Sequence, residues 1–268
     1  MQPLAYTTSI MSWRFLLSAM KRICATENAM HPVDLNLEAP PCVLLCCTAV
    51  EAFANEISCL SSAFLFNEKE NSVRYLTGAQ EETAMRMGRE TCQGIEKIKD
   101  GAKESFYKRY KALLNAMKIE KPTCLLCLAH LRDLRNALVH FRLCNVPIVY
   151  GSDGVIQYAQ EPPKVFAHLK SYNVNGSPVV SVDPDDNGVE WTLRVSTNAM
   201  AAWSLNLALE AITHVLDRIP AGRYRDFILK AYASRDVSFS DVFEKGKSDL
   251  KAWQSGLFSN GLRKWHAP

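Results

Sequence analysis

Apolar residues recur at helical spacing along most of the chain, and the pattern changes only in one central stretch. Spacings of three and four residues between apolar positions are typical of helices that bury one face. The pattern predicts helices over residues 6–25, 41–66, 104–119, 123–143, 198–219, 223–232 and 240–254. Residues 72–98 are more polar and contain three glycines, so helix and loop both stay open there.

The predicted helix over residues 41–66 is apolar on nearly every side, so we expect it at the centre of the fold. The predicted helix over residues 123–143 has the length and apolar content of a second central helix. Pro41 fits the first turn of one helix, and Thr123 can cap the other.

Between Val146 and Ser196, short apolar runs alternate with turn residues, which is the pattern of β-hairpins. It predicts one hairpin from PIVY and VIQY and a second from SPVVSV and VEWTLRV. Because apolar helix faces flank this stretch on both sides, the hairpins are expected as an insertion in a helical bundle. We therefore expect a mainly α fold: one domain over residues 1–268, a β-rich insertion at 145–197 and a C-terminal helical extension at 221–268.

The composition is that of a folded globular chain, with 48% hydrophobic and 22% charged residues. This excludes an intrinsically disordered protein. No run approaches the roughly 18 apolar residues of a membrane span, and no basic cluster precedes an apolar run at the N-terminus. We expect a cytoplasmic protein that has no contact with a membrane.

Positive charge is concentrated in residues 97–142, which hold 11 Lys and Arg against 4 Asp and Glu. The whole chain has a net charge of only +3. The asymmetry favours an anionic partner such as a nucleic acid.

The nine cysteines are predicted to be reduced, because an odd number cannot all pair and most lie in apolar runs. A thiol in such a run behaves as a small hydrophobic group, as we expect for Cys42, Cys46, Cys47, Cys59, Cys124 and Cys127. The last two have CxxC spacing, but no second CxxC or HxxxH supplies further ligands. We expect neither a metal nor a cofactor.

A polar stripe runs along the second central helix. Arg132, Asn136 and His140 lie at i, i+4 and i+8, so they share one face. Arg135 lies about 140° around the axis from His140, and only its long side chain can bring it to the same site. Buried polar groups of this kind need partners, because each unsatisfied group costs a few kcal/mol.

The first central helix offers such partners. Glu51 and Asn55 lie at i and i+4 among apolar neighbours. We expect the two helices to face each other at this point, with Glu51 pairing with one of the two arginines and Asn55 with Asn136 or His140.

The two helices carry the sequences VEAFANEI and LRDLRNALVHF. Together they resemble the HEPN family, whose RNxxxH form of the Rx4–6H motif is matched by Arg135, Asn136 and His140. The resemblance covers residues 13–143 and 198–219. It implies a helical bundle that dimerises through the motif helices, and many members are metal-independent endoribonucleases that act as toxins or in antiphage defence.

The resemblance also implies roles for the motif residues. Arg135 would hold and polarise the scissile phosphate, His140 would move a proton, and Asn136 would orient the phosphate or His140. These residue types suit the chemistry, because histidine has an unperturbed pKa of about 6.5 and arginine presents a permanently charged fork to phosphate oxygens. Attack by the ribose 2′-hydroxyl would give a 2′,3′-cyclic phosphate and a 5′-hydroxyl, so that RNA is cleaved and DNA is not.

Three further residues would support the motif: Glu51 or Asn55 would fix the arginine or the imidazole, and Arg132 would extend the stripe. The partners implied are RNA, with tRNA among the substrates, a second copy of the chain, and an antitoxin or regulatory protein. Some family toxins carry a tyrosine two residues after the histidine as a modification site, whereas this chain has Arg142.

The alternative is a non-catalytic HEPN module that dimerises and binds a partner protein. In that case the stripe would satisfy Glu51 and Asn55 and lock the helix register, with His140 as a structural histidine. His130 and His168 stand in unrelated sequence contexts, and we expect them to be structural or solvent-facing.

Overall fold

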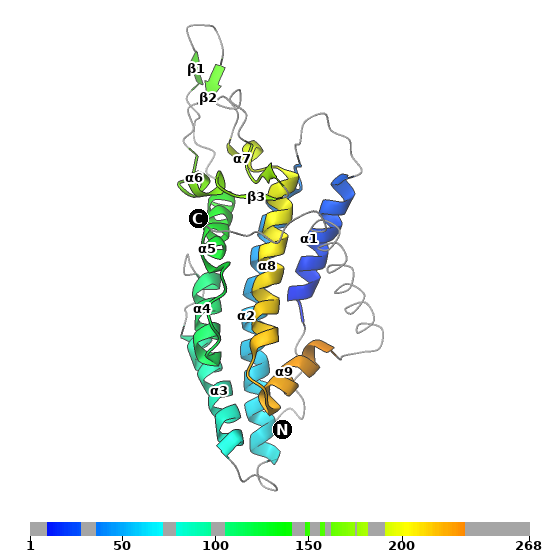
Figure 1. Cartoon of the computed structure of the whole chain (residues 1–268), viewed down its shortest axis with the longest axis vertical. Helices are drawn as coiled ribbons and strands as arrows, with labels where there is room; N and C mark the ends of the chain where they lie inside the picture. Colours follow the sequence, from blue (N-terminus) through cyan, green and yellow to red (C-terminus); the bar gives the residue numbers. More distant parts are fainter. Residues whose placement is uncertain are drawn as a thin grey trace. The chain divides into compact units, whose positions relative to one another are not determined.

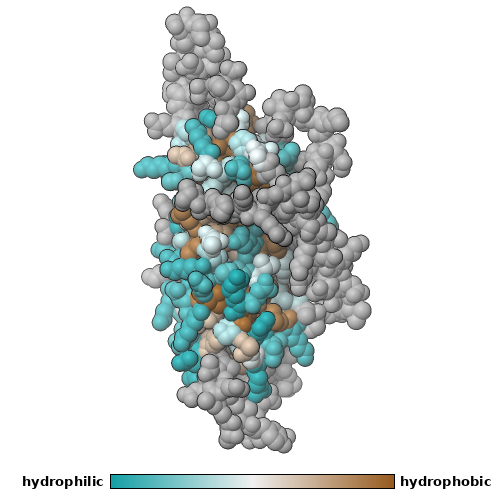
Figure 2. All heavy atoms as spheres, viewed as in Figure 1, coloured by the Kyte–Doolittle hydropathy of each residue, from teal (hydrophilic) through white to brown (hydrophobic). Residues whose placement is uncertain are grey.

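The computed structural model describes residues 10–27, 36–71, 79–97, 105–140, 148–150, 156–158, 162–174, 176–181 and 191–233. Of these described residues, 77% are helical, in nine helices, and the strands form two antiparallel pairs (Figure 1). The predicted mainly α-helical class is confirmed. Figure 2 shows one face, where hydrophilic side chains cover most of the described area and hydrophobic ones lie among them.

The chain forms two compact units, each built from separate stretches of sequence. Unit 1 contains residues 1–15, 48–125 and 209–248, and unit 2 contains residues 16–47, 126–208 and 249–268. The β-rich insertion belongs wholly to unit 2.

Unit 1 is helical. It holds the start of α1 (Ser12–Glu27), most of α2 (Ala39–Asn71), α3 (Ala79–Glu96), α4 (Ser105–Met117), the second half of α8 (Asn198–Arg218) and α9 (Arg223–Ala233). Helix α3 packs against both α4 and α9. The core includes Phe53, Tyr110 and Tyr224, and the Tyr110 hydroxyl donates to the Ala211 carbonyl at 2.9 Å.

Helix α3 confirms that residues 79–96 of the open stretch are helical. Gly88 permits a close approach of α3 to α2. A Cβ atom at Gly88 would lie 3.3 Å from Leu65 Cδ2, which is tighter than ordinary packing. The glycine therefore suits this point because it lets the two helices come together.

Unit 2 holds the rest of α1, the start of α2, α5 (Leu125–Val139), the insertion and the first half of α8. Helix α2 lies beside α8 in Figure 1. Within this unit, Cys46 of α2 and Ser204 of α8 share a side-chain hydrogen bond. The first turn of α2 contains Pro40 and Pro41, as the sequence predicts for Pro41, because proline lacks an N–H that this turn would leave unused.

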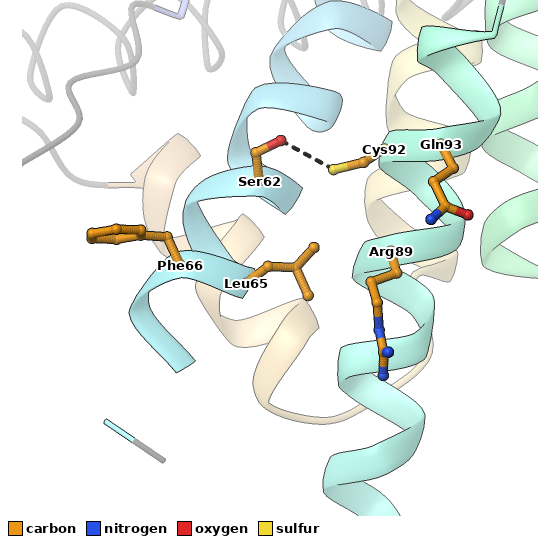
Figure 3. Close-up of a pocket in the computed structure, with 6 residues that line it drawn as sticks. All are labelled: Ser62, Leu65, Phe66, Arg89, Cys92 and Gln93. Carbon is orange, nitrogen blue, oxygen red and sulfur yellow. Dashed lines mark hydrogen bonds between the residues drawn. The ribbon is translucent and has the colours of Figure 1, made fainter. Parts of the chain in front are cut away.

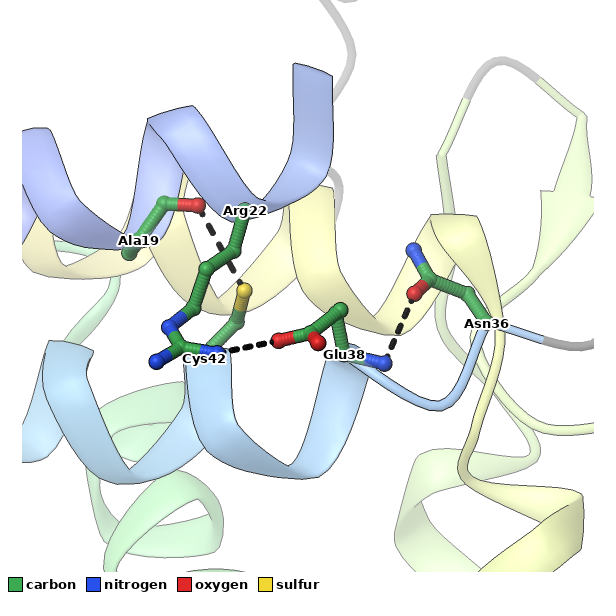
Figure 4. Close-up of polar contacts among 5 residues, drawn as sticks. All are labelled: Ala19, Arg22, Asn36, Glu38 and Cys42. Carbon is green, nitrogen blue, oxygen red and sulfur yellow. Dashed lines mark hydrogen bonds and ion pairs between the residues drawn. The ribbon is translucent and has the colours of Figure 1, made fainter. Parts of the chain in front are cut away.

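Figure 4 shows how α1 and α2 are joined in unit 2. The Arg22 guanidinium binds the Glu38 carboxylate at 2.6 Å, and Cys42 Sγ donates to the Ala19 carbonyl at 3.5 Å. Burial, with a smaller contribution from Glu38, raises the pKa of Cys42 to about 12. The thiol therefore stays protonated and acts as a donor within the helix pair.

The first predicted hairpin is confirmed. Strands β1 (Ile148–Tyr150) and β2 (Ile156–Tyr158) pair antiparallel, with Val149 opposite Gln157.

The second predicted hairpin is wrong. The strand β4 (Ser177–Pro178) pairs with β3 (Asn173–Val174) around Gly176, whose φ of 81° requires a residue that tolerates the left-handed region. The expected partner segment forms the short helix α7 (Trp191–Arg194) instead, with Trp191 buried. A further short helix, α6 (Val165–Leu169), also lies within the insertion. One backbone bond, from Ser181 N–H to the Arg194 carbonyl at 2.8 Å, still joins the two segments that were expected to pair.

The other predicted helices are confirmed, with shifts at their ends. Helix α8 begins directly after Thr197. The Thr197 hydroxyl accepts a hydrogen bond from the Met200 N–H at 2.9 Å and so caps the helix as predicted. Helix α1 begins at Ser12 rather than near residue 6. The predicted helix at residues 240–254 lies outside the described residues.

Two helices are long and apolar enough to cross a bilayer by length and composition, which corrects the expectation that no segment reaches that length. They are residues 39–66, with mean hydropathy 1.6, and residues 198–218, with mean hydropathy 1.2. Within the described fold, 61% of the first window and 83% of the second are buried by the protein itself. This burial accounts for their apolar composition, because helices that form a protein core show the same pattern.

The cysteines whose side chains the structure describes are free thiols: Cys42, Cys46, Cys47, Cys59, Cys92, Cys124 and Cys127. Five of the six that were expected to act as small hydrophobic groups are buried, and Cys59 is exposed instead. Cys59 directly precedes the buried Leu60 in α2, and the two side chains leave the helix in different directions. The apolar run around Cys59 therefore did not predict whether its side chain is buried or exposed.

Candidate functional site

The motif residues lie at the C-terminal end of α5. The helix ends at Val139, and His140 follows directly, with its N–H still bonded to the Asn136 carbonyl at 3.0 Å. The helix therefore fixes the backbone of His140 although the residue itself stands beyond the last turn.

Arg135 and Asn136 are joined by their side chains. Arg135 Nη1 donates to Asn136 Oδ1 at 3.1 Å. Asn136 lies on the same face as His140, so this bond turns the guanidinium toward that face of α5. Asn136 thus contacts both other motif residues, Arg135 through its side chain and His140 through its backbone carbonyl.

Arg132 is engaged by the next residue in the chain. Its Nε and Nη2 atoms lie 2.9 and 2.7 Å from Asp133 Oδ1, and the arginine side chain is only 13% exposed. The carboxylate therefore offsets part of the positive charge of the stripe at this point.

The end of the motif is open to solvent. His140 is exposed, while Arg135 and Asn136 are half-buried. Val139, the residue before the histidine in the chain, is 48% exposed. The arrangement can present an imidazole, a guanidinium and an apolar contact to a bound molecule.

Glu51 and Asn55 belong to unit 1, whereas the motif of α5 belongs to unit 2. Both residues are half-buried. Asn55 Oδ1 accepts a hydrogen bond from Arg109 Nη1 at 2.7 Å, and Arg109, on α4, was not among the expected partners. The pairing of Glu51 and Asn55 with the motif stays a prediction.

Sequence reasoning missed a second cluster in unit 2. The rings of His130 on α5 and His168 on α6 stack with centroids 4.4 Å apart and planes 7° apart. His130 Nδ1 lies 2.7 Å from the hydroxyl of Tyr172. The two histidines were expected in unrelated contexts, and the structure brings them together because the insertion folds back onto α5.

Burial lowers the pKa of His130, and the neighbouring His168 lowers it further. Arg132 acts in the same direction, while Asp133 opposes it. The buried ring is therefore held in its neutral form, in which one ring nitrogen donates and the other accepts.

The CxxC thiols each have a separate partner. Cys124 shares a side-chain hydrogen bond with Glu210 within unit 1, and Cys127 shares one with Tyr172 within unit 2. Both thiols are buried. These contacts favour the structural interpretation of the pair.

Unit 1 also contains a hollow of about 280 Å³ between α2 and α3, and none of the residues predicted to be functional lines it (Figure 3). Ser62, Leu65 and Phe66 line it from α2, and Arg89, Cys92 and Gln93 line it from α3. Ser62 Oγ and Cys92 Sγ lie 3.1 Å apart, which ties the two helices together.

Among the described side chains, no group of three or more His, Cys, Asp or Glu residues is arranged to hold a metal ion. Comparisons of the chain with protein-family models, with curated proteins and with solved structures found no match.

Proposed function

We propose that the chain is a metal-independent endoribonuclease of the HEPN type, with Arg135, Asn136 and His140 at its active site. The observation that carries the proposal is the side-chain contact between Arg135 and Asn136 in the helical turn before the exposed His140. The Asn136 amide oxygen accepts a hydrogen bond from the Arg135 guanidinium at 3.1 Å.

Each residue has a defined task in this mechanism. The guanidinium of Arg135 binds the non-bridging oxygens of the scissile phosphate, where negative charge increases during the reaction. His140 takes the proton of the ribose 2′-hydroxyl, whose oxygen attacks phosphorus while the bond to the 5′-oxygen breaks. In a homodimer, the second His140 gives a proton to the leaving oxygen, so the products are a 2′,3′-cyclic phosphate and a 5′-hydroxyl.

The solvent exposure of His140 supports this assignment, because a general base must reach its substrate. RNA, including tRNA, is the proposed substrate, and a cytoplasmic toxin or antiphage effector that a separate antitoxin controls is the proposed role.

Cleavage of RNA by the purified chain in EDTA tests the proposal. We expect cleavage to persist in EDTA, to leave 2′,3′-cyclic phosphate ends, and to disappear in His140→Ala. Asn115→Ala is the matched control, because Asn115 is also exposed near the end of a helix and lies outside the motif. Cleavage by His140→Ala at the wild-type rate would remove this histidine from the mechanism.

A partner-binding HEPN module is the second candidate, and exposed apolar residues of α5 favour it. Leu126 is 59% exposed and Val139 is 48% exposed. If no RNA in a broad panel is cleaved, and Leu126→Ser with Val139→Ser abolishes self-association in light scattering, the module replaces the enzyme.

A further inference from the structure

His168 is an exposed ring that rests on a buried aromatic cluster. One face of its imidazole stacks on His130 at 4.4 Å, and His130 is only 9% exposed. His130 is in turn held by Tyr172, whose ring stacks on Trp203 with centroids 5.5 Å and planes 20° apart. Trp203 is fully buried in α8.

This support fixes the position of a flat side chain at the surface. His168 itself is exposed although one of its faces is covered. A ring that is already ordered loses little conformational entropy when a second ring stacks on it. The geometry is thus suited to a flat, unsaturated ligand group.

The surroundings of His168 are positively charged. Lys164 and Lys170 are exposed at the two ends of α6, and no Asp or Glu occurs in the sequence from Pro162 to Ser181. The acid that acts on His130 is Asp133, which already binds Arg132 at 2.7 Å. A flat ring on a short helix that carries an exposed lysine at each end therefore fits a ligand that combines a planar group with anionic groups.

We infer that α6 binds single-stranded RNA, with one unpaired base stacked on His168 and the flanking phosphates on Lys164 and Lys170. The inference rests on the proposed function, because it describes how the ribonuclease holds its substrate away from the motif. Single-stranded nucleic acid is held in this way elsewhere, by stacking platforms next to basic groups. The insertion is then the substrate-binding part of unit 2.

The first test measures stacking directly on the wild-type chain. The probe is a single-stranded oligonucleotide that carries 2-aminopurine and is 2′-O-methylated throughout, so that it cannot be cleaved. We expect binding to quench the fluorescence of 2-aminopurine. We also expect His168→Ala to bind about 5- to 150-fold more weakly and His168→Phe, which keeps a flat ring, to retain the quenching.

A change in the RNA separates stacking from damage to the fold. Replacing the stacked base by an abasic site should weaken binding to the wild type but not to His168→Ala. If the abasic site weakens RNA binding equally in the wild type and in His168→Ala, the inference is wrong. It is also wrong if His168→Ala binds the original oligonucleotide with unchanged affinity and quenching.

The salt dependence of binding tests the lysines. The logarithm of the binding constant falls as the logarithm of the salt concentration rises. For a single strand, each lost phosphate contact makes this slope shallower by about 0.7, so Lys164→Gln with Lys170→Gln should make it shallower by about 1.4. Lys21→Gln with Lys230→Gln is the control, because both lysines are exposed on other helices and lie outside the basic stretch of residues 97–142. A double variant with the wild-type slope would remove the phosphate contacts from the proposal.

The outcomes distinguish this inference from the ribonuclease itself. Cleavage that needs His140 but not His168 leaves the enzyme and overturns the inference. Stacked binding without cleavage of unmodified RNA overturns the enzyme and keeps the inference. A chain that neither binds the oligonucleotide nor cleaves unmodified RNA overturns both.

Discussion

Glu56, in the middle of α2, accepts hydrogen bonds from both the backbone N–H and the hydroxyl of Ser12, at 2.8 and 2.7 Å. The same carboxylate accepts the Met11 N–H at 2.6 Å and the Tyr232 hydroxyl at 2.9 Å. Glu56 is only 5% exposed. It therefore caps α1 from another helix and ties α9 to the same point, all within unit 1.

Replacing this carboxylate should destabilise the fold. Glu56→Gln keeps the shape but offers only one acceptor oxygen and turns an amide NH₂ toward groups that are donors. Hydrogen bonds to a charged group contribute about 1.5–3 kcal/mol each, so we expect a loss of about 3 kcal/mol in the free energy of unfolding, measured with urea.

Glu90→Gln is the control for that substitution. Its carboxylate is exposed, lies 3.9 Å from Arg86, and should contribute less than about 0.5 kcal/mol. If Glu56→Gln unfolds at the same urea concentration as Glu90→Gln, the carboxylate does not hold α1 and α9.

Two glycines of α3 should respond in different ways to the same substitution. A Cβ atom at Gly94 would lie 3.8 Å from its nearest neighbour, which is ordinary contact, so Gly94→Ala should raise the free energy of unfolding by about 0.5–1 kcal/mol. At Gly88 the Cβ would lie 3.3 Å from Leu65 Cδ2, and displacement of that side chain should cancel the gain of about 1 kcal/mol. Thermal unfolding of both variants tests whether Gly94→Ala is the more stable one. An equal gain in both would show that the Leu65 side chain of α2 moves aside at no cost.

The buried histidine predicts a loss of stability in acid. Burial and the charge of His168 lower the pKa of His130 in the folded state. Below the unfolded pKa of about 6.5, the unfolded chain binds a proton that the folded chain does not, so the free energy of unfolding falls as pH falls until the folded pKa is passed. Urea midpoints between about pH 7.5 and about pH 5 measure this loss.

Substitution of His168 separates this effect from general acid unfolding. The groups that act on His130 are His168 and Tyr172 of the insertion and Arg132 and Asp133 of its own helix. His168→Gln removes the neighbouring positive charge, so the acid loss should become smaller. If His168→Gln loses as much unfolding free energy in acid as the wild type, protonation of the histidine pair is not the cause of the loss.

The sequence predicted the helices well because helical periodicity is a local property. Apolar residues three and four apart identify a buried face whatever packs against it, as in α4, where Phe106, Tyr110 and Leu113 are all buried. The exact ends depended on distant groups. Helix α1 begins at Ser12 because Glu56 supplies the acceptor there, and no local pattern contains that information.

The parts that sequence reasoning missed are contacts between distant segments. Asn55 and Glu56 are adjacent polar residues, and their spacing does not tell which of them is buried among donors. The second hairpin failed for a similar reason: its turn residues predicted local pairing, whereas burial of Trp191 and the bond from Thr197 Oγ1 to the Val179 carbonyl hold these segments differently. The motif residues could be proposed from the sequence because they are local to one helix.

The contact between Asn136 and Arg135 predicts how the proposed enzyme fails when it is broken. Asn136→Ala leaves both reacting groups in place but frees the guanidinium, whose bond to Asn136 Oδ1 is 3.1 Å long. A displacement of about 1 Å can lower a rate by about 10²-fold, so we expect a loss of that size in kcat with little change in affinity for a non-cleavable RNA. Arg135→Ala should lower kcat further, by about 10²- to 10³-fold, because the charge itself is lost. Single-turnover cleavage measures both, and Asn136→Asp should behave like wild type only if an acceptor oxygen is all that Arg135 requires. A larger loss in Asn136→Ala than in Arg135→Ala would mean that Asn136 acts on the substrate directly and not through the arginine.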